Sequence, residues 1–279
     1  MSRSRLRPGA FRTGTESGST APHLFRLTGK NQWYVIDKIP LEIESTESEI
    51  RFRDCFSVRY IQSAALLCRL GYGIEQAGRL SPLTQEDLLR HEAFILNSVL
   101  STVAFLECTI NELYADVADD AYFCPDEQHE QLLATIRDGW NNEKNFDRSP
   151  LIGKYQKILT IAGRAPFEEG DQAYDNVRTL VEIRNHLMHY RREWVVINDG
   201  GAPGQSGETT TDKFEKVLRK KFASNPLAEK NLPFFPDACL GHGCAEWAIA
   251  NSIIFTDAFF RNLDLPVPYD GIRDELATR

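Results

Sequence analysis

Apolar side chains recur every three or four residues over most of this chain, which is the spacing of an α-helix that buries one face. Thr84 and Asp87 form a capping box at the start of one such stretch, and Asp171 or Asp175 begins another. Gly78 is expected to end the helix that precedes Thr84. The pattern predicts helices over about 51–77, 84–117, 128–139, 149–162, 171–190 and 239–263.

Only the beginning of the chain alternates in the manner of β-strands. The stretches HLFRL (23–27) and QWYVID (32–37) are separated by TGKN, and together they predict one small β-hairpin. No internal repeat is apparent. The predicted fold class is therefore all-α, a helical bundle with a small N-terminal β-hairpin and additional flanking helices.

Composition suggests how these elements are divided along the chain. The first residues are rich in Gly, Ser, Thr and Arg, which is typical of a disordered tail. The segments we expect are a tail over 1–22, the hairpin and first helix over 23–84, a helical core over 85–195, a loop-rich basic segment over 196–238 and a C-terminal helix packing on the core over 239–279.

Charge and cysteine usage narrow the class of protein. The chain has 279 residues and a formal net charge of −8, so RNA contact requires a local basic site. Six cysteines in a chain of this length do not form a disulfide framework, which favours a reducing compartment. No signal peptide or bilayer-spanning stretch is apparent. We expect a soluble, cytoplasmic protein without a membrane partner.

Two of the predicted helices each place one charge on an inward-facing stripe. Steps of three and four along the apolar positions of 171–190 arrive at Arg184. On 84–117, Glu107 interrupts the corresponding stripe. A charge on a buried face must be paired or used, so we infer that these helices pack together and that Glu107 lies near Arg184. A structural ion pair and a functional site are both compatible with this spacing.

More polar side chains follow in the stretch RNHLMHY (184–190). Asn185 and His189 are four positions apart and share a helix face, with His186 three positions before His189. Arg184 and His189 are separated by about 140° around an ideal helix. One helix therefore does not aim both at a single small group. A frayed helix end, or a second copy of the chain related by a two-fold axis, would bring them together.

At these residues the chain resembles a known family. The arrangement from Arg184 to His189 is similar to the R-x4-H signature of HEPN-domain proteins, where asparagine often follows the arginine. The stretch VAFLECTINELYADV (103–117) is similar to the first core helix of many bacterial HEPN proteins, with Glu107 and Asn111 at its polar positions. The resemblance covers about residues 85–192 and implies a HEPN-like core that forms a homodimer with a composite site.

The resemblance implies metal-independent endoribonuclease activity, without a cofactor. The ribose 2′-hydroxyl attacks the adjacent phosphate and leaves a 2′,3′-cyclic phosphate. His189 is then the acid or base, Arg184 stabilises the transition state, Asn185 orients the site and Glu107 holds the arginine. Secondary candidates at this site are His186, Asn111 and Tyr190.

Such bacterial enzymes often act as toxins or phage-defence effectors, which implies RNA as a partner, together with an antitoxin or another defence protein. In a related toxin group, the antitoxin modifies a tyrosine two residues after the histidine. Here Tyr190 follows His189 directly and position 191 is arginine. We therefore do not expect that control mechanism in this chain.

Two further signals are weaker. The segment KFEKVLRKKF (213–222) is basic, and either contacts RNA phosphates or forms a solvated helix face. The candidate RNA-binding residues are Lys213, Lys216, Arg219, Lys220, Lys221, Arg191 and Arg192. The stretch CLGHGC (239–244) lacks the ligand number and spacing of a zinc site, so we expect no metal there.

Two other function classes remain open. In one, the chain is a helical binding or scaffold module in which Arg184 and Glu107 form a structural pair. In the other, it is a nucleotide-binding sensor that uses the same arginine and histidine without cutting. A scaffold is expected to bury both histidines of the stretch away from any cleft.

Overall fold

The computed structural model describes residues 25–27, 30–34, 41–45, 50–119, 127–142, 148–192, 209–229 and 234–279, with side chains from Cys55 onward except at 127–128 and 141–142. The chain divides into two compact units, Met1–Phe52 and Arg53–Arg279. The predicted disordered tail, residues 1–22, lies outside the described residues.

Short strands occupy the N-terminal part of the chain. They are β1 (Phe25–Leu27), β2 (Lys30–Tyr34), β3 (Leu41–Ser45) and β4 (Ile50–Asp54). β1 and β2 are antiparallel, with Phe25 opposite Tyr34, and β3 pairs with β4. β1 and β2 fall within the predicted hairpin, but the residues that connect them lie outside the described ones. The hairpin as a unit therefore stays a prediction.

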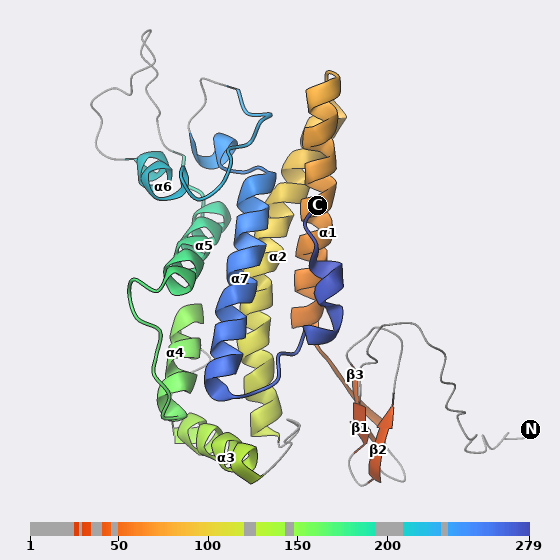
Figure 1. The fold of residues 1–279 in the computed structure, drawn as a ribbon, viewed down its shortest axis with the longest axis vertical. Coiled ribbons are helices and arrows are strands. Elements are labelled where there is room, and N and C mark those ends of the chain that lie inside the picture. The colour runs from red at the N-terminus through yellow and green to blue at the C-terminus, as the bar shows by residue number, and fades with distance from the viewer. Residues whose placement is uncertain are drawn as a thin grey trace, which may run out of the picture. The chain divides into compact units, whose positions relative to one another are not determined.

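The described residues from Cys55 onward contain helices and no strands, so the all-α prediction is confirmed for this part of the chain. Its helices are α1 (Phe56–Leu80), α2 (Gln85–Ala118), α3 (Glu127–Asn142), α4 (Leu151–Ile161), α5 (Gln172–Met188), α6 (Thr210–Leu218) and α7 (His242–Leu263). Two short helical turns, η2 (Phe234–Ala238) and η3 (Asp270–Leu276), flank α7. Figure 1 shows α1, α2 and α7 running side by side, with α4 and α5 along α7 and α2.

Buried aromatic side chains hold α4, α7 and α2 together. The ring of Tyr155 on α4 packs edge-on against Phe255 and Phe259 of α7, with centroids 4.9 and 4.8 Å away. Its hydroxyl donates a hydrogen bond to the carbonyl oxygen of Leu106 on α2, at 2.6 Å. Because the hydroxyl finds this partner, the whole ring is buried without leaving a polar atom unsatisfied. This contact positions the start of α4 against α2.

The helix predicted over 51–77 is shifted in the structure. α1 begins at Phe56, because Ile50–Asp54 forms strand β4, and it continues through Gly78 to Leu80. Its first turn is capped from α2, since the Glu112 carboxylate accepts hydrogen bonds from the backbone N–H groups of Phe56 and Ser57, at 2.6 and 2.9 Å. Such capping between distant segments leaves no local signature in the sequence.

The caps predicted from local sequence are confirmed. Thr84 and Asp87 form a reciprocal capping box at α2, with both backbone-to-side-chain bonds at 3.1 Å. Asp171 accepts the Ala173 N–H at 3.0 Å and begins α5. One window of α2 is apolar enough by composition to cross a membrane, but half of it is buried. A core helix passes the same test, so this window is weak evidence for a membrane span.

Candidate functional site

Arg184 on α5 and Glu107 on α2 lie side by side, which confirms the proximity predicted from the two stripes. Arg184 Nη2 is 3.5 Å from Glu107 Oε2. Their neighbours Ile183 and Leu106 are fully buried and pack the two helices into the core. The arginine and glutamate side chains are 27% and 41% exposed. The pair therefore lies at the edge of the core, where the guanidinium can still be reached from solvent.

Lys154 on α4 joins this pair, and sequence reasoning missed it. Its Nζ lies 3.4 Å from Glu107 Oε1 and donates a hydrogen bond to Asn111 Oδ1 at 2.9 Å. The lysine side chain is only 4% exposed. It follows Leu151 by three positions and precedes Ile158 by four, on the buried stripe of α4. The rule that singled out Arg184 would have identified it too.

These four side chains, Glu107, Asn111, Lys154 and Arg184, are called the Glu107 cluster below. The cluster holds two cations and one carboxylate, and each oxygen of that carboxylate faces a different cation. Within the part of the chain that the structure describes, no second carboxylate forms an ion pair with either cation. The cluster therefore carries one positive charge in excess, which favours anions at its exposed edge.

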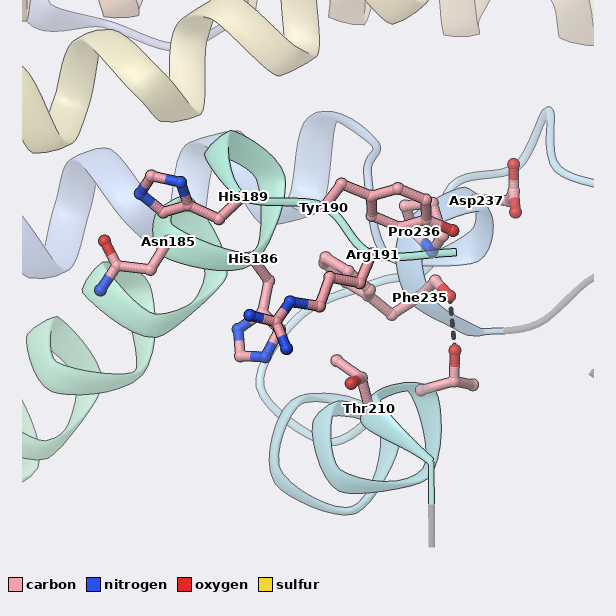
Figure 2. Close-up of a pocket in the computed structure, with 10 residues that line it drawn as sticks. Asn185, His186, His189, Tyr190, Arg191, Thr210, Phe235, Pro236 and Asp237 are labelled. Atoms are coloured by element: carbon pink, nitrogen blue, oxygen red, sulfur yellow. Dashed lines mark hydrogen bonds between the residues drawn. The ribbon is translucent and has the colours of Figure 1, made fainter. Parts of the chain in front are cut away.

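A pocket of about 480 Å³ opens at the C-terminal end of α5 (Figure 2). Helix α5 ends at Met188, and the N–H of the capping residue His189 donates to the Asn185 carbonyl oxygen at 2.9 Å. The polar side chains of this helix end are exposed to solvent. The pocket is lined by Asn185, His186, His189, Tyr190, Arg191, Thr210, Thr211, Phe235, Pro236 and Asp237.

His186 is the most firmly held of the pocket histidines. Its Nδ1–H donates to the Glu182 carbonyl oxygen at 2.9 Å, and its ring packs edge-on against Phe214 of α6, with centroids 5.0 Å apart. In the neutral ring this bond leaves Nε2 as the acceptor. Figure 2 shows His186 and Arg191 on the side of α6, with His189 and Asn185 on the other side of the helix end.

The single chain does not bring Arg184 and His189 together. No hydrogen bond or ion pair among the described residues joins them, and the described lining of the pocket does not include Arg184. This agrees with their wide separation around α5. The Glu107 cluster and the pocket are therefore two separate faces of the same helix.

Part of the basic segment 213–222 lies on the amphipathic helix α6 (Thr210–Leu218). α6 buries Phe214 and Leu218 and begins with a Thr209–Asp212 capping box, whose hydrogen bonds lower the pKa of the Asp212 carboxyl. Among the candidate RNA-binding residues, the exposed ones are Lys213, Lys216, Arg219, Lys220, Arg191 and Arg192. Lys221 is half-buried and donates to Asn176 Oδ1.

The CLGHGC stretch packs into the start of α7. Cys239 and Cys244 are buried, and a hydrogen bond from Cys239, followed by burial, raises the pKa of the Cys244 thiol. His242 Nε2 donates to the Thr278 carbonyl oxygen at 3.1 Å. Across the described ranges, no group of three or more His, Cys, Asp or Glu side chains could hold a metal ion.

Comparison of the chain with protein-family models, with curated proteins and with solved structures finds no match. The HEPN resemblance of residues 85–192 therefore stays an expectation. The Glu107 cluster and the pocket are the two places in the described residues where polar and charged side chains of the RNHLMHY stretch and its neighbours gather.

Proposed function

We propose that the protein is a metal-independent endoribonuclease of the HEPN type, whose helical core spans about residues 85–192. The observation that carries the proposal is the partly exposed Arg184 paired with Glu107, on the helix that presents His189 at its open end. A guanidinium with one side fixed by a carboxylate can use its remaining N–H groups for two phosphate oxygens. The imidazole of an exposed histidine has one nitrogen that can accept a proton and one that can donate a proton, so it can serve in proton transfer.

The proposed reaction forms one bond and breaks one. The ribose 2′-oxygen attacks the adjacent phosphorus while the bond from phosphorus to the 5′-oxygen breaks, leaving a 2′,3′-cyclic phosphate and a 5′-hydroxyl. His189 takes the 2′-hydroxyl proton or supplies a proton to the leaving oxygen. Arg184 stabilises the charge on the phosphorane, and Asn185 orients the substrate.

The proposal includes a homodimer with a composite site. His189 lines the pocket and Arg184 does not, so one chain presents the two groups on different faces. A two-fold axis near the end of α5 would place the histidine of one copy by the arginine of the other. The same symmetry supplies two histidines, one for each proton transfer.

Cationic side chains on α6 and in the pocket provide a surface for RNA on an otherwise acidic protein. Thr210 and Thr211 from the first turn of α6 line the pocket, and the outer face of α6 presents Lys213 and Lys216 to solvent. Arg191 lines the pocket itself. These cations supply the local basic site that the net charge of −8 requires. The proposed setting is cytoplasmic, where the enzyme acts as a toxin or defence effector under the control of a partner protein.

The experiment is cleavage of a labelled RNA pool in EDTA by the full chain. We expect the wild type to cut and leave cyclic-phosphate ends, whereas Arg184→Ala and His189→Ala lose at least about a hundredfold in rate. Arg178→Ala serves as the control, because Arg178 is on the same helix, 43% exposed, and pairs with Glu169 at 3.0 Å.

Equal cutting by all variants would place the activity elsewhere and reject the proposed site. Absence of cutting by a folded wild-type dimer, with and without added nucleotides, would reject the ribonuclease. A purely structural role for the histidines is disfavoured by their exposure, since His186 and His189 both line an open pocket.

A nucleotide-binding sensor is the second candidate. The pocket has a volume suited to a small ligand and combines the aromatic rings of Tyr190 and Phe235 with the Arg191 guanidinium, and it does so without Arg184. Such a lining suits a base and a phosphate bound together. A rise in melting temperature with a mononucleotide, without RNA cutting, would favour the sensor over the nuclease.

A further inference from the structure

We infer that Lys154 is a positioning residue that keeps the Glu107 cluster cationic, so that Arg184 binds a phosphate of a nucleic-acid backbone. The inference rests on the proposed function for the identity of the ligand. It assigns a role to a helix, α4, that carries none of the residues discussed for the reaction itself.

The charge of the Glu107 cluster depends on how its single carboxylate is shared between two cations. Glu107 alone would neutralise Arg184, since its Oε2 lies 3.5 Å from the guanidinium. Lys154 Nζ lies 3.4 Å from the other oxygen, Oε1, and offsets part of the same carboxylate charge. Because one carboxylate serves two cations, Arg184 keeps charge that its pair with Glu107 would otherwise cancel. A phosphate approaching the guanidinium therefore meets a net attraction.

Burial decides which of the two cations meets the ligand. The Lys154 side chain is 4% exposed, and its ammonium is already directed to Asn111 and Glu107. The Arg184 side chain is 27% exposed. The lysine therefore acts through the carboxylate, while the arginine is the cation that a ligand can reach from solvent. A charge below the surface is poorly screened by salt, so its influence on the guanidinium persists at physiological ionic strength.

Opposite substitutions in the cluster then have opposite effects on anion binding. Lys154→Met removes the excess charge, and Glu107→Gln adds to it. The double variant returns the cluster to one positive charge, carried by Arg184. A merely structural role makes all three changes harmful, with the double variant worst.

The test measures the affinity of the full chain for a fluorescently labelled single-stranded DNA 10-mer by anisotropy. This probe lacks the 2′-hydroxyl, so it binds without being cut. We expect Lys154→Met to weaken binding by about tenfold, Glu107→Gln to tighten it by about threefold and the double variant to return near the wild type. Lys154→Arg keeps the charge and should bind within about twofold of wild type.

Arg178→Met is the charge-matched control, because it removes one exposed cation from the same helix outside the cluster. It should change the affinity by less than about twofold. Competition by inorganic phosphate should be strongest in Glu107→Gln, which shows that the probe's phosphates are recognised. Thermal melting verifies that each variant is folded.

Weaker binding by Glu107→Gln, with the double variant weaker still, would overturn the inference. An unchanged affinity in Lys154→Met would also overturn the inference. If the wild type cuts RNA in that case, the proposed function still stands. The expected pattern of affinities in a protein that does not cut RNA supports the role of Lys154 and rejects only the nuclease.

Discussion

Arg184 Nη2 and Glu107 Oε2 lie 3.5 Å apart across the contact between α5 and α2. Each residue interrupts an otherwise apolar stripe, and each supplies the opposite charge that the other needs. The pair remains partly exposed because it sits where the two helices meet solvent. A partly exposed position is more suitable for a charge that binds a ligand than for a charge that only stabilises the core.

Substitutions at Lys154 should separate charge from packing in the stability of the bundle. Lys154→Met leaves Glu107 paired with Arg184 and fills the same space, so we expect the free energy of unfolding to change by less than about 1 kcal/mol. Lys154→Glu places a second carboxylate beside Glu107 and should cost about 3 kcal/mol. Urea unfolding followed by circular dichroism measures both. Equal losses in the two variants would show that the lysine is needed to fold.

Two glycines should respond in opposite directions to alanine. A Cβ on Gly73, within α1, meets nothing within 4 Å, so Gly73→Ala should stabilise the protein by about 0.5–1 kcal/mol through helix propensity. A Cβ on Gly243 collides with the backbone carbonyl oxygen of Ala223, which cannot move aside as a side chain can. Gly243→Ala should therefore cost about 2 kcal/mol. Melting temperatures that move in the same direction would contradict this packing at α7.

The ion pair between Glu246 and Arg279 should make stability depend on pH in the acid range. Hydrogen bonds from Arg279, and then from Thr278, lower the pKa of the Glu246 carboxyl in the folded state. A lowered folded pKa adds stability above the unfolded value, about 4.3, and that stability is lost as the pH falls through the folded value.

Glu246→Gln should therefore be less stable than the wild type at pH 7, by less than about 1 kcal/mol because the arginine is largely exposed. The gap should close as the pH is lowered toward 3. Unfolding free energies of both proteins across this range provide the check, and a gap that widens in acid would reverse the assigned sign.

Cys108 should report on opening of the site, since it adjoins Glu107 on α2. Burial raises the pKa of its thiol to about 11. At pH 8 only about one thiol in a thousand is then ionised, so iodoacetamide should react roughly a hundredfold more slowly than with an ordinary cysteine. Mass spectrometry of peptides from native and urea-unfolded protein measures the ratio. Rapid labelling of the native protein would show that this part of α2 is open.

Local signals account for the parts of the fold that sequence reasoning predicted. The capping box at Thr84 and Asp87 and the cap at Asp171 involve residues within a few positions of one another, so spacing alone reveals them. The Glu107–Arg184 pair was also predicted, because each charge breaks an apolar stripe. Lys154 breaks the apolar stripe of α4 in the same way, so the same rule applied to this helix identifies it as an inward charge.

Other features depend on segments that are far apart in the sequence. The start of α1 is decided by the Glu112 carboxylate of α2. This carboxylate accepts hydrogen bonds from backbone N–H groups 56 and 55 residues earlier in the chain. The wall of the pocket is likewise shared by three separate elements, the end of α5, α6 and η2, joined in part by the 2.6 Å bond from Thr211 Oγ1 to the Phe235 carbonyl oxygen. Contacts between such distant segments leave no periodic pattern in the sequence.

The sequence by itself determined the helical class of the unit Arg53–Arg279, most helix positions and the match of one inward acid to one inward base. These follow from periodicity and from the cost of burying an unpaired charge. Only the tertiary structure decided that Glu107 is shared with Lys154, and that the open end of α5 forms a pocket with α6 and η2. Both depend on how distant segments pack, because the partner of a buried charge and the walls of a pocket are set by neighbours in space.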